Sequence, residues 1–480
     1  MKQAFLQSDT GKAVVISIGA LLLSFLVGLL TIQFGIITFF ASTIGTAALI
    51  FIIATIKDPR IGFLFYLVYC FLLSGIMKNF PFLPLGPSME MILGLTWVSI
   101  FINANKFKWS NLNNDYCLLV LIWFIINILE VLNPAGASLL GWLNEIRFTA
   151  LNWLMVAPLA FIIFNSKKDL NTFFKVTIGA SVFAALYGVK QLYIGVSSEE
   201  QRWLNEGADF THIVFGELRV FSLFTDAGQF GASQAHMALV TLVLALGPFK
   251  LWKKVLLGIA ASILIYGMLI SGTRGALFAL VSGAFFAIFL TKNFKVLIIG
   301  TICSLMFFSF LKYSTYGNQY YEIRRLRTAL DPQDASLNAR LMNQAKLKEA
   351  LKNLPFGGGV GITGVNGDKY NSDKYLSSIP PDSYWVKIWV MYGVVGLVIW
   401  FSFIMYLLGK SCGLVWNIED KKLKTKAIAL TSGVAGLFFC SYGNEVMNGL
   451  PSSIIMYMSW AYVFLIPKFD NPELKDDEYV

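Results

Sequence analysis

The side chains best suited to chemistry in this sequence are arginines that stand among glycines and small polar residues. Arg219 opens the segment Arg219–Gly231, which also holds Asp226 and leads into a long apolar run. Arg274 stands in the tight connection Ser271–Gly275 between two apolar runs. A guanidinium group keeps its charge at physiological pH and can bind two phosphate oxygens at once. So short a connection has no structural need for a charge, and we therefore expect Arg274 to serve a phosphorylated ligand.

Arg219 and Arg274 lie in connections that we place on the outer side of a membrane, as the distribution of apolar runs and lysines described below indicates. Further basic residues are predicted on that side, and most of them are arginines. They are Arg147, Lys190, Arg202, Arg219, Arg274, Arg324, Arg325, Arg327, Arg340 and Lys387. In a membrane, the phosphorylated ligand that suits them is a lipid-linked phosphate or pyrophosphate. For any one of these residues the alternative stays open that it is solvated or pairs with a nearby glutamate, such as Glu145 or Glu217.

Asp382 is the carboxylate with the most suggestive position. It follows two prolines and stands just before the long apolar run that begins at Tyr384. A carboxylate there could act as a general base if it reaches an incoming hydroxyl group. It could equally cap the helix that follows, since Asp and Ser are preferred capping residues. The two roles are compatible.

The hydrophilic segment 312–383 contains one predicted helix and one glycine-rich stretch. Arg340, Gln344 and Lys348 recur at four-residue spacing after Asp334, which indicates a helix with one polar face. The stretch Pro355–Gly361 then supplies four glycines without the GxxxxGK pattern of a nucleotide-binding loop. We expect these glycines to form a flexible or tightly turned connection.

The elements that must position these residues are membrane helices. Hydrophobic residues make up 56% of the 480 residues and charged residues only 14%, whereas soluble domains carry about a quarter charged residues. With about 20 apolar residues per crossing, the sequence predicts an all-α polytopic membrane protein with about fourteen transmembrane helices. We expect one membrane domain over residues 1–480, with a retained N-terminal anchor and the single large loop 312–383. The predicted spans are 13–31, 34–56, 61–77, 89–104, 116–132, 148–164, 172–194, 228–248, 254–270, 275–291, 294–311, 384–408, 426–443 and 452–467.

The distribution of lysines predicts the orientation. Lysines gather in alternate connections, for example at Lys250, Lys253 and Lys254, while the other connections outside the large loop carry few basic residues. Because basic residues favour the cytoplasmic side, both termini are predicted to be cytoplasmic and the large loop to face outward, into the periplasm. The net charge of +10 is explained by this bias, so it does not indicate a nucleic-acid partner.

Cysteines and histidines offer no metal or disulfide framework. None of the five cysteines forms a CxxC pair, and the chain has only two histidines, His212 and His236. A zinc site or disulfide framework is therefore not expected, and a multi-histidine metal centre is excluded. We expect no cofactor.

Four motifs in a fixed order resemble the O-antigen ligase/polymerase family of bacterial envelope glycan transferases. They are Arg219…Asp226…Gly231; Ser271-Gly-Thr-Arg-Gly275; Arg340 with Pro355-Phe-Gly-Gly-Gly359; and Pro381-Asp-Ser-Tyr384 followed by Tyr392-Gly-Val-Val-Gly396. The resemblance covers roughly residues 210–410, and the N-terminal half agrees only in its topology.

The resemblance implies an inverting, metal-independent glycosyl transfer on the periplasmic face of the bacterial inner membrane. The donor in that family is a glycan on undecaprenyl pyrophosphate. Ligases transfer it to lipid A-core or another acceptor, and polymerases transfer a growing chain to the next lipid-linked repeat, in lipopolysaccharide or exopolysaccharide biosynthesis. The family's pyrophosphate-binding arginines correspond to Arg219, Arg274 and Arg340. Secondary site candidates are Asp226, Arg147, Lys190, Arg324 and Lys387.

One position departs from the family. Ligases carry a His-Asn pair at the head of the helix after the loop, and this sequence has Asp382 and Ser383 there. The change favours a polymerase or a ligase with a different acceptor, with Asp382 as the candidate base and Arg274 as its catalytic partner. The main alternative function is a flippase or transporter of lipid-linked oligosaccharide. A transporter should show two related halves, and neither the loop nor the Ser-Gly-Thr-Arg-Gly motif has a second copy.

Overall fold

The fold is almost entirely helical, as the sequence predicts. A computed structural model describes residues 35–331 and 333–470, together with some residues between 17 and 33. Within these residues the only strands are β1 (Ile213–Val214) and β2 (Glu217–Leu218), which form one antiparallel pair. Helices and their connections therefore position the site.

Contacts divide the chain into two compact units. The first comprises residues 1–63 and 94–104, and the second comprises residues 64–93 and 105–480. The helices α3 (Ile36–Lys57), α4 (Pro59–Asn79) and α5 (Ser88–Ile102) come first in the described chain. In the first unit, Ser99 and Asn103 at the end of α5 both donate hydrogen bonds to the carbonyl oxygen of Ile56, over 3.0 and 3.1 Å.

The second unit holds the remaining helices. They are α6 (Asp115–Leu129), α7 (Leu139–Ile146), α8 (Asn152–Ile162), α9 (Lys167–Tyr193), α10 (Ser198–Trp203), α11 (Asp209–His212), α12 (Ala227–Leu246), α13 (Leu251–Ile270), α14 (Arg274–Leu290), α15 (Phe294–Tyr313), α16 (Tyr321–Arg327), α17 (Ala335–Ala350), α18 (Gly364–Tyr370), α19 (Tyr384–Asn417), α20 (Lys421–Cys440) and α21 (Ser452–Asp470). Single 3-10 turns lie at Ala104–Lys106, Trp109–Leu112, Glu130–Leu132, Thr328–Leu330 and Tyr375–Ser378, and π-helical turns at Arg147–Leu151 and Leu204–Ala208.

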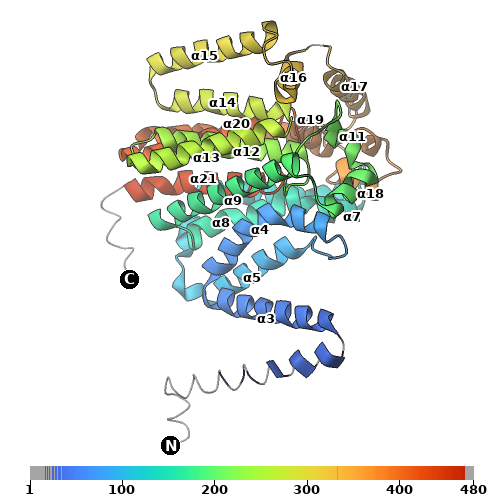
Figure 1. The fold of residues 1–480 in the computed structure, drawn as a ribbon, viewed down its shortest axis with the longest axis vertical. Coiled ribbons are helices and arrows are strands. Elements are labelled where there is room, and N and C mark those ends of the chain that lie inside the picture. The colour runs from blue at the N-terminus through green and yellow to red at the C-terminus, as the bar shows by residue number, and fades with distance from the viewer. Residues whose placement is uncertain are drawn as a thin grey trace, which may run out of the picture. The chain divides into compact units, whose positions relative to one another are not determined.

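Helix α12 lies at the centre of this unit. It contacts α9, α13, α14 and α20, and nearly all of its side chains are buried. Helix α15 packs beside α14, and the short helices α16 and α17 lie near the end of α14 that carries Arg274 (Figure 1). The core helices therefore hold the start of α14 in place, and the loop helices α16 and α17 lie next to it.

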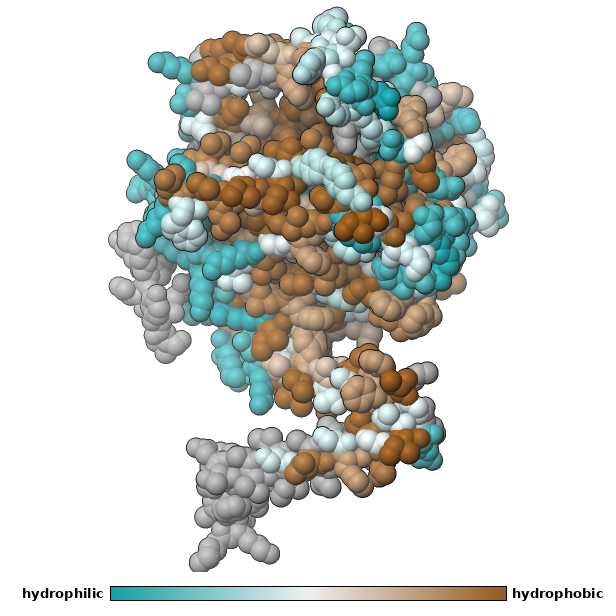
Figure 2. Space-filling view, in the orientation of Figure 1, coloured by the Kyte–Doolittle hydropathy of each residue, from teal (hydrophilic) through white to brown (hydrophobic). Residues whose placement is uncertain are grey.

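Several described helices have the length and composition of membrane spans. Among the described residues, nine stretches are long and apolar enough to cross a membrane, and α5, α14 and residues Ile298–Tyr313 of α15 are apolar but shorter. Figure 2 shows hydrophobic surface along the middle of the second unit's helices and hydrophilic residues towards their ends. The first predicted span, 13–31, falls largely outside the described residues. The number of fourteen spans and the cytoplasmic location of the termini stay predictions.

Two of the helices differ in extent from the spans predicted around them. The span predicted at 148–164 begins already at Leu139, because α7, a π-helical turn and α8 run on without a break. The span predicted at 384–408 continues to Asn417 in α19. Helix length is set here by packing and capping as well as by hydropathy.

Helix α19 is interrupted at Gly393, and the glycine-rich stretch of the loop fills the interruption. The backbone N–H of Gly358 donates to the carbonyl of Val390 over 2.8 Å, and that of Gly359 to Met391 over 2.9 Å. In return, Val395 N–H donates to the carbonyl of Pro355 over 3.2 Å. These bonds replace the helical bonds that the break removes, as backbone groups away from water require. The two glycine motifs thus form one joint between the loop and α19.

We predict that Gly393→Ala disrupts this joint. Gly393 has a φ of +67°, and a Cβ atom there would overlap backbone atoms of Pro355 and Gly357. The variant should lose about 3 kcal/mol of stability or more, because the backbone must leave a left-handed conformation and move away from the loop. The measurement is the fraction of detergent-solubilised protein that stays monodisperse after heating. Gly409→Ala is the matched control, since a Cβ there meets open space in the same helix; equal stability of the two variants would contradict the prediction.

Candidate functional site

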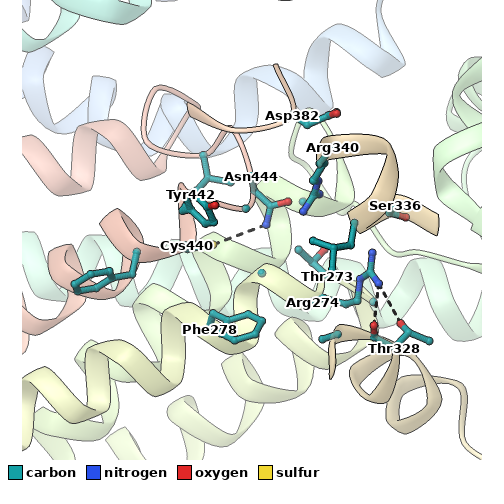
Figure 3. A pocket seen from close by; sticks show the side chains of 18 of the residues that line it. Thr273, Arg274, Phe278, Thr328, Ser336, Arg340, Asp382, Cys440, Tyr442 and Asn444 are labelled. Atoms are coloured by element: carbon teal, nitrogen blue, oxygen red, sulfur yellow. Dashed lines mark hydrogen bonds between the residues drawn. The ribbon is translucent and has the colours of Figure 1, made fainter. Parts of the chain in front are cut away.

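A cavity of about 1340 Å³ in the second unit brings arginines from four segments together. Arg219 follows strand β2, Arg274 is the first residue of α14, Arg325 belongs to α16 and Arg340 to α17. Figure 3 shows Arg340 between Asp382 and Arg274, with Asn444 beside it. The structure thus places the three predicted pyrophosphate ligands Arg219, Arg274 and Arg340 on one cavity.

Arg274 has a partner within the protein. Its Nη1 atom forms an ion pair with Asp334 over 2.6 Å and donates to the carbonyl of Thr328 over 3.2 Å. Asp334 is also the cap of α17, where it accepts the N–H of Leu337 over 2.9 Å. Burial alone would raise the pKa of Asp334. The hydrogen bonds from Arg274 and from the N–H of Leu337, together with the charges of Arg274 and Arg325, outweigh burial, and the pKa lies below its usual value. Arg274 therefore anchors α17 to the start of α14 as well as lining the cavity.

The other three arginines line the cavity without an ion pair to any described residue. Arg219 donates to the carbonyl of Thr211 over 2.8 Å and to Thr273 Oγ1 over 3.3 Å. Arg325 donates to the carbonyl of Gly272 over 3.3 Å. Arg340 makes no hydrogen bond to the part of the chain that the structure describes. These groups keep donors available for a ligand.

Burial and the repulsion between neighbouring guanidinium groups both lower the pKa of these arginines. Burial lowers the pKa of Arg219, Arg325 and Arg340, and the charge of Arg274 lowers each of the three further. Nearby carboxylates offset only part of this effect; for Arg340 the carboxylate is Asp382. Like charges gathered in a partly buried site are costly unless an anion joins them. The cluster is therefore a candidate anion-binding site.

Most of the carboxylates on the cavity wall are engaged elsewhere. Asp226 caps α12 by accepting the N–H of Gln229 over 2.9 Å, so this secondary candidate has a structural role. Asp331 accepts the N–H of Gln333 over 2.9 Å. Glu445, in the connection between α20 and α21, forms an ion pair with Lys387.

Asp382 is placed to face the cavity and does not cap a helix. Ser383 is the cap of α19, where its side chain accepts the N–H of Val386. Asp382 is exposed, lines the cavity and accepts one hydrogen bond, from Asn343 over 3.3 Å. Its φ of +53° is unusual for a residue with a side chain, and such backbone strain concentrates at functional sites. The structure therefore excludes Asp382 as the cap of α19 and places it on the cavity wall.

His212 also lines the cavity, but both of its ring nitrogens are occupied. Its Nδ1 atom lies 2.9 Å from the carbonyl oxygen of Ala208, and its Nε2 atom accepts the N–H of Ala227 over 3.2 Å. Burial lowers the pKa of this histidine and keeps it neutral. The only other histidine, His236, is buried within α12. Neither histidine therefore offers a free ring nitrogen to the cavity.

One wall of the cavity is apolar. It is formed by Phe278, Phe285 and Phe286 of α14 and by Leu305 and Phe308 of α15. Phe285 lies eleven residues after Arg274, about 16 Å along the helix axis. The cavity therefore joins a charged end to an extended aromatic wall.

The remaining secondary candidates do not line this cavity. Arg147 forms an ion pair with Glu90 over 2.7 Å, and Lys190 lies 5.5 Å from the ring centre of Tyr187. Arg324 is exposed on α16, and Lys387 is buried between two glutamates. Residue type and the predicted side of the membrane therefore selected more candidates than the cavity contains.

Two wall residues were not among the site candidates: the sequence named Arg325 only as one of the outer basic residues, and it did not indicate Glu445. Arg325 follows the nominated Arg324 directly, and only the helix geometry of α16 decides which of the pair faces the cavity. Glu445 lies in a connection without a family motif, and its partner Lys387 is distant in sequence. Sorting the residues of the loop helices by helix face could have distinguished Arg325 from Arg324.

We predict that Asp334→Asn loosens α17 from α14. Asparagine still caps the helix, but the ion pair with Arg274 is lost, at a cost of about 1–2 kcal/mol. Amide hydrogens in the first turns of α17 should then exchange about 5- to 30-fold faster, as hydrogen-exchange mass spectrometry can measure. Asp331→Asn, which removes no ion pair of the described residues, is the control. Unchanged exchange in the Asp334 variant would show that the pair does not hold the helix.

The comparisons with known proteins give one family match. Residues 259–401 match the model of the family described as O-antigen ligase, and a search of curated proteins finds no match. The matched range includes Arg274, Arg325, Arg340 and Asp382, and it confirms the resemblance that the motifs indicated. Residues 259–401 are therefore similar to the O-antigen ligase family, and this similarity supports a role as a membrane glycan ligase or polymerase.

Proposed function

We propose that this protein transfers a glycan from undecaprenyl pyrophosphate to a sugar hydroxyl during the synthesis of a cell-envelope polysaccharide. The observation that carries the proposal is the cavity, which combines an apolar wall with three arginines that form no ion pair with a described residue. The reaction takes place on the outer face of the bacterial inner membrane, where the large loop and the arginine cluster meet.

The arginines suit the pyrophosphate part of the donor. A diphosphate has several anionic oxygens, and guanidinium groups from four segments can bind them from different sides. The same contacts strengthen as the diphosphate departs, because its negative charge grows when the bond to the sugar breaks. We expect no divalent cation to be needed, since the guanidinium charges lie where a metal ion would otherwise act.

The aromatic wall suits the prenyl part of the donor. Phe278, Phe285 and Phe308 offer a continuous apolar surface that begins next to Arg274. Isoprene units buried there are removed from water and lipid headgroups, while the diphosphate stays at the charged end. Such an arrangement fixes the anomeric carbon near the polar end of the cavity.

Transfer to the acceptor needs a group that takes the hydroxyl proton. The acceptor oxygen attacks the anomeric carbon from the side opposite the diphosphate, which inverts its configuration. Two carboxylates on the wall can accept the proton, Asp382 and Glu445. The acceptor is either another lipid-linked glycan or a lipid A-core sugar; the Asp382-Ser383 pair in place of His-Asn favours the polymerase reaction.

We predict that Arg340→Ala abolishes glycan extension or attachment without loss of the protein from the membrane. Arg340 lines the cavity and makes no bond with a described residue, so its removal takes away a ligand contact and little structure. Losing one charge-assisted contact to the diphosphate should lower the transfer rate at least about tenfold. The measurement is the glycan ladder on an immunoblot from a deletion strain complemented with each variant.

The neighbouring pair Arg324 and Arg325 supplies the matched comparison. Arg325→Ala should act like Arg340→Ala, whereas Arg324→Ala, on the exposed side of the same helix, should leave the ladder unchanged. Arg274→Ala should also abolish the ladder, but it releases Asp334 and is the less specific test. Wild-type ladders from the Arg340 and Arg325 variants would defeat the proposed function.

A further inference from the structure

Glu445, one of the two carboxylates on the cavity wall that can accept a proton, belongs to a cluster of three charges with Lys387 and Glu145. The Lys387 ammonium forms ion pairs with Oε1 of Glu145, over 2.8 Å, and with Oε1 of Glu445. The side chains of Lys387 and Glu145 are 6% and 3% exposed, whereas that of Glu445 is 30% exposed and lines the cavity. Glu445 is thus the one member of the trio that a substrate can reach.

The hydrogen bonds leave one oxygen of the trio available. Asn366 donates to Oε2 of Glu145 over 2.8 Å, so both oxygens of that carboxylate are occupied. Asn448 donates to Oε1 of Glu445 over 3.0 Å, the same atom that Lys387 contacts. Oε2 of Glu445 accepts no hydrogen bond from any described residue, and it belongs to the carboxylate that opens to the cavity.

The trio has two carboxylates and one ammonium group. Lys387 and Glu145 form its buried pair, and Glu445 presents the second carboxylate to the cavity. Oε2 of Glu445 can therefore accept a proton from a bound hydroxyl without giving up a hydrogen bond to any described residue, while the pair of Lys387 and Glu145 stays balanced.

The backbone around Glu445 is held in position. Gln229 of α12 donates to the carbonyl oxygen of Glu445 over 2.8 Å. The N–H of Tyr384, at the start of α19, donates to Ser441 over 3.0 Å and to Asn444 over 3.4 Å. Asp382, by contrast, is held by one contact of 3.3 Å in an exposed connection. A proton acceptor that is fixed in advance is the more effective one.

We propose that Glu445 is the catalytic base of the transfer, with Lys387 and Glu145 as its positioning residues; this rests on the proposed function above. The acceptor oxygen forms its bond to the anomeric carbon of the donor while its proton moves to Oε2 of Glu445. The bond between that carbon and the pyrophosphate oxygen breaks, and its electron pair leaves with the diphosphate. The arginines bind the departing anion, and the trio becomes neutral.

The test compares charge removal at the two glutamates of the trio. Glu445→Gln and Glu145→Gln each leave Lys387 with one carboxylate, so both proteins should fold. In membranes from complemented deletion strains, which hold the native donor and acceptor, Glu445→Gln should lower the initial rate of ladder growth about 100-fold or more. Glu145→Gln should lower it by less than about tenfold, because the carboxylate in the cavity remains. Binding of farnesyl diphosphate, as a probe of the arginine cluster, should be unchanged in Glu445→Gln.

Chemical rescue separates a base from a structural residue. Added formate should restore at least about a tenth of the wild-type rate to Glu445→Ala and should not affect Glu145→Ala. The proposal is overturned if Glu445→Gln keeps the wild-type rate, if it loses farnesyl diphosphate binding, or if formate rescues Asp382→Ala in place of Glu445→Ala. Each of these results leaves the proposed function standing, since that depends on the arginine variants.

Discussion

The ion pair between Arg274 and Asp334 is the contact on which the assembly of the site depends. Arg274 begins a helix of the membrane core, and Asp334 begins the loop helix that carries Arg340. The pair neutralises one guanidinium group and so limits the repulsion that four neighbouring arginines would otherwise produce. It also fixes the distance between a residue of the core and a residue of the loop. The remaining arginines form no ion pair with a described residue, in a site that this contact already holds together.

A second constraint comes from the backbone of α19. The break at Gly393 leaves carbonyl and N–H groups that cannot stay unpaired in an apolar environment, and the Pro355–Gly359 segment supplies their partners. The loop is therefore joined to the core at its glycine stretch and, through Asp334, at the start of α17. Asp382 follows these two joints in the chain and stands just before Tyr384, the first residue of α19. The loop is long, but its glycine stretch and the start of α17 are both held against core helices.

The sequence was sufficient to predict the helical class and the three arginines that meet at the cavity, because hydropathy and residue chemistry act locally. It was insufficient for Asp226 and Lys387, whose roles as a cap and as a buried counter-ion depend on their neighbours in space. The cap of α19 illustrates the limit. Asp382 and Ser383 are both good caps, and only the backbone geometry decides that Ser383 takes this role and Asp382 faces the cavity. Glu445 had no signal in the sequence, since its partners Lys387 and Glu145 are far away along the chain.

The central claim is that the arginine cluster binds a prenyl diphosphate. Its most direct test is the affinity of the purified protein, in lipid nanodiscs, for undecaprenyl pyrophosphate. The account predicts that Arg340→Ala and Arg325→Ala weaken this affinity at least about tenfold, the loss of one charge-assisted contact, and that Arg324→Ala does not. Equal affinity in all three variants and the wild type would contradict it.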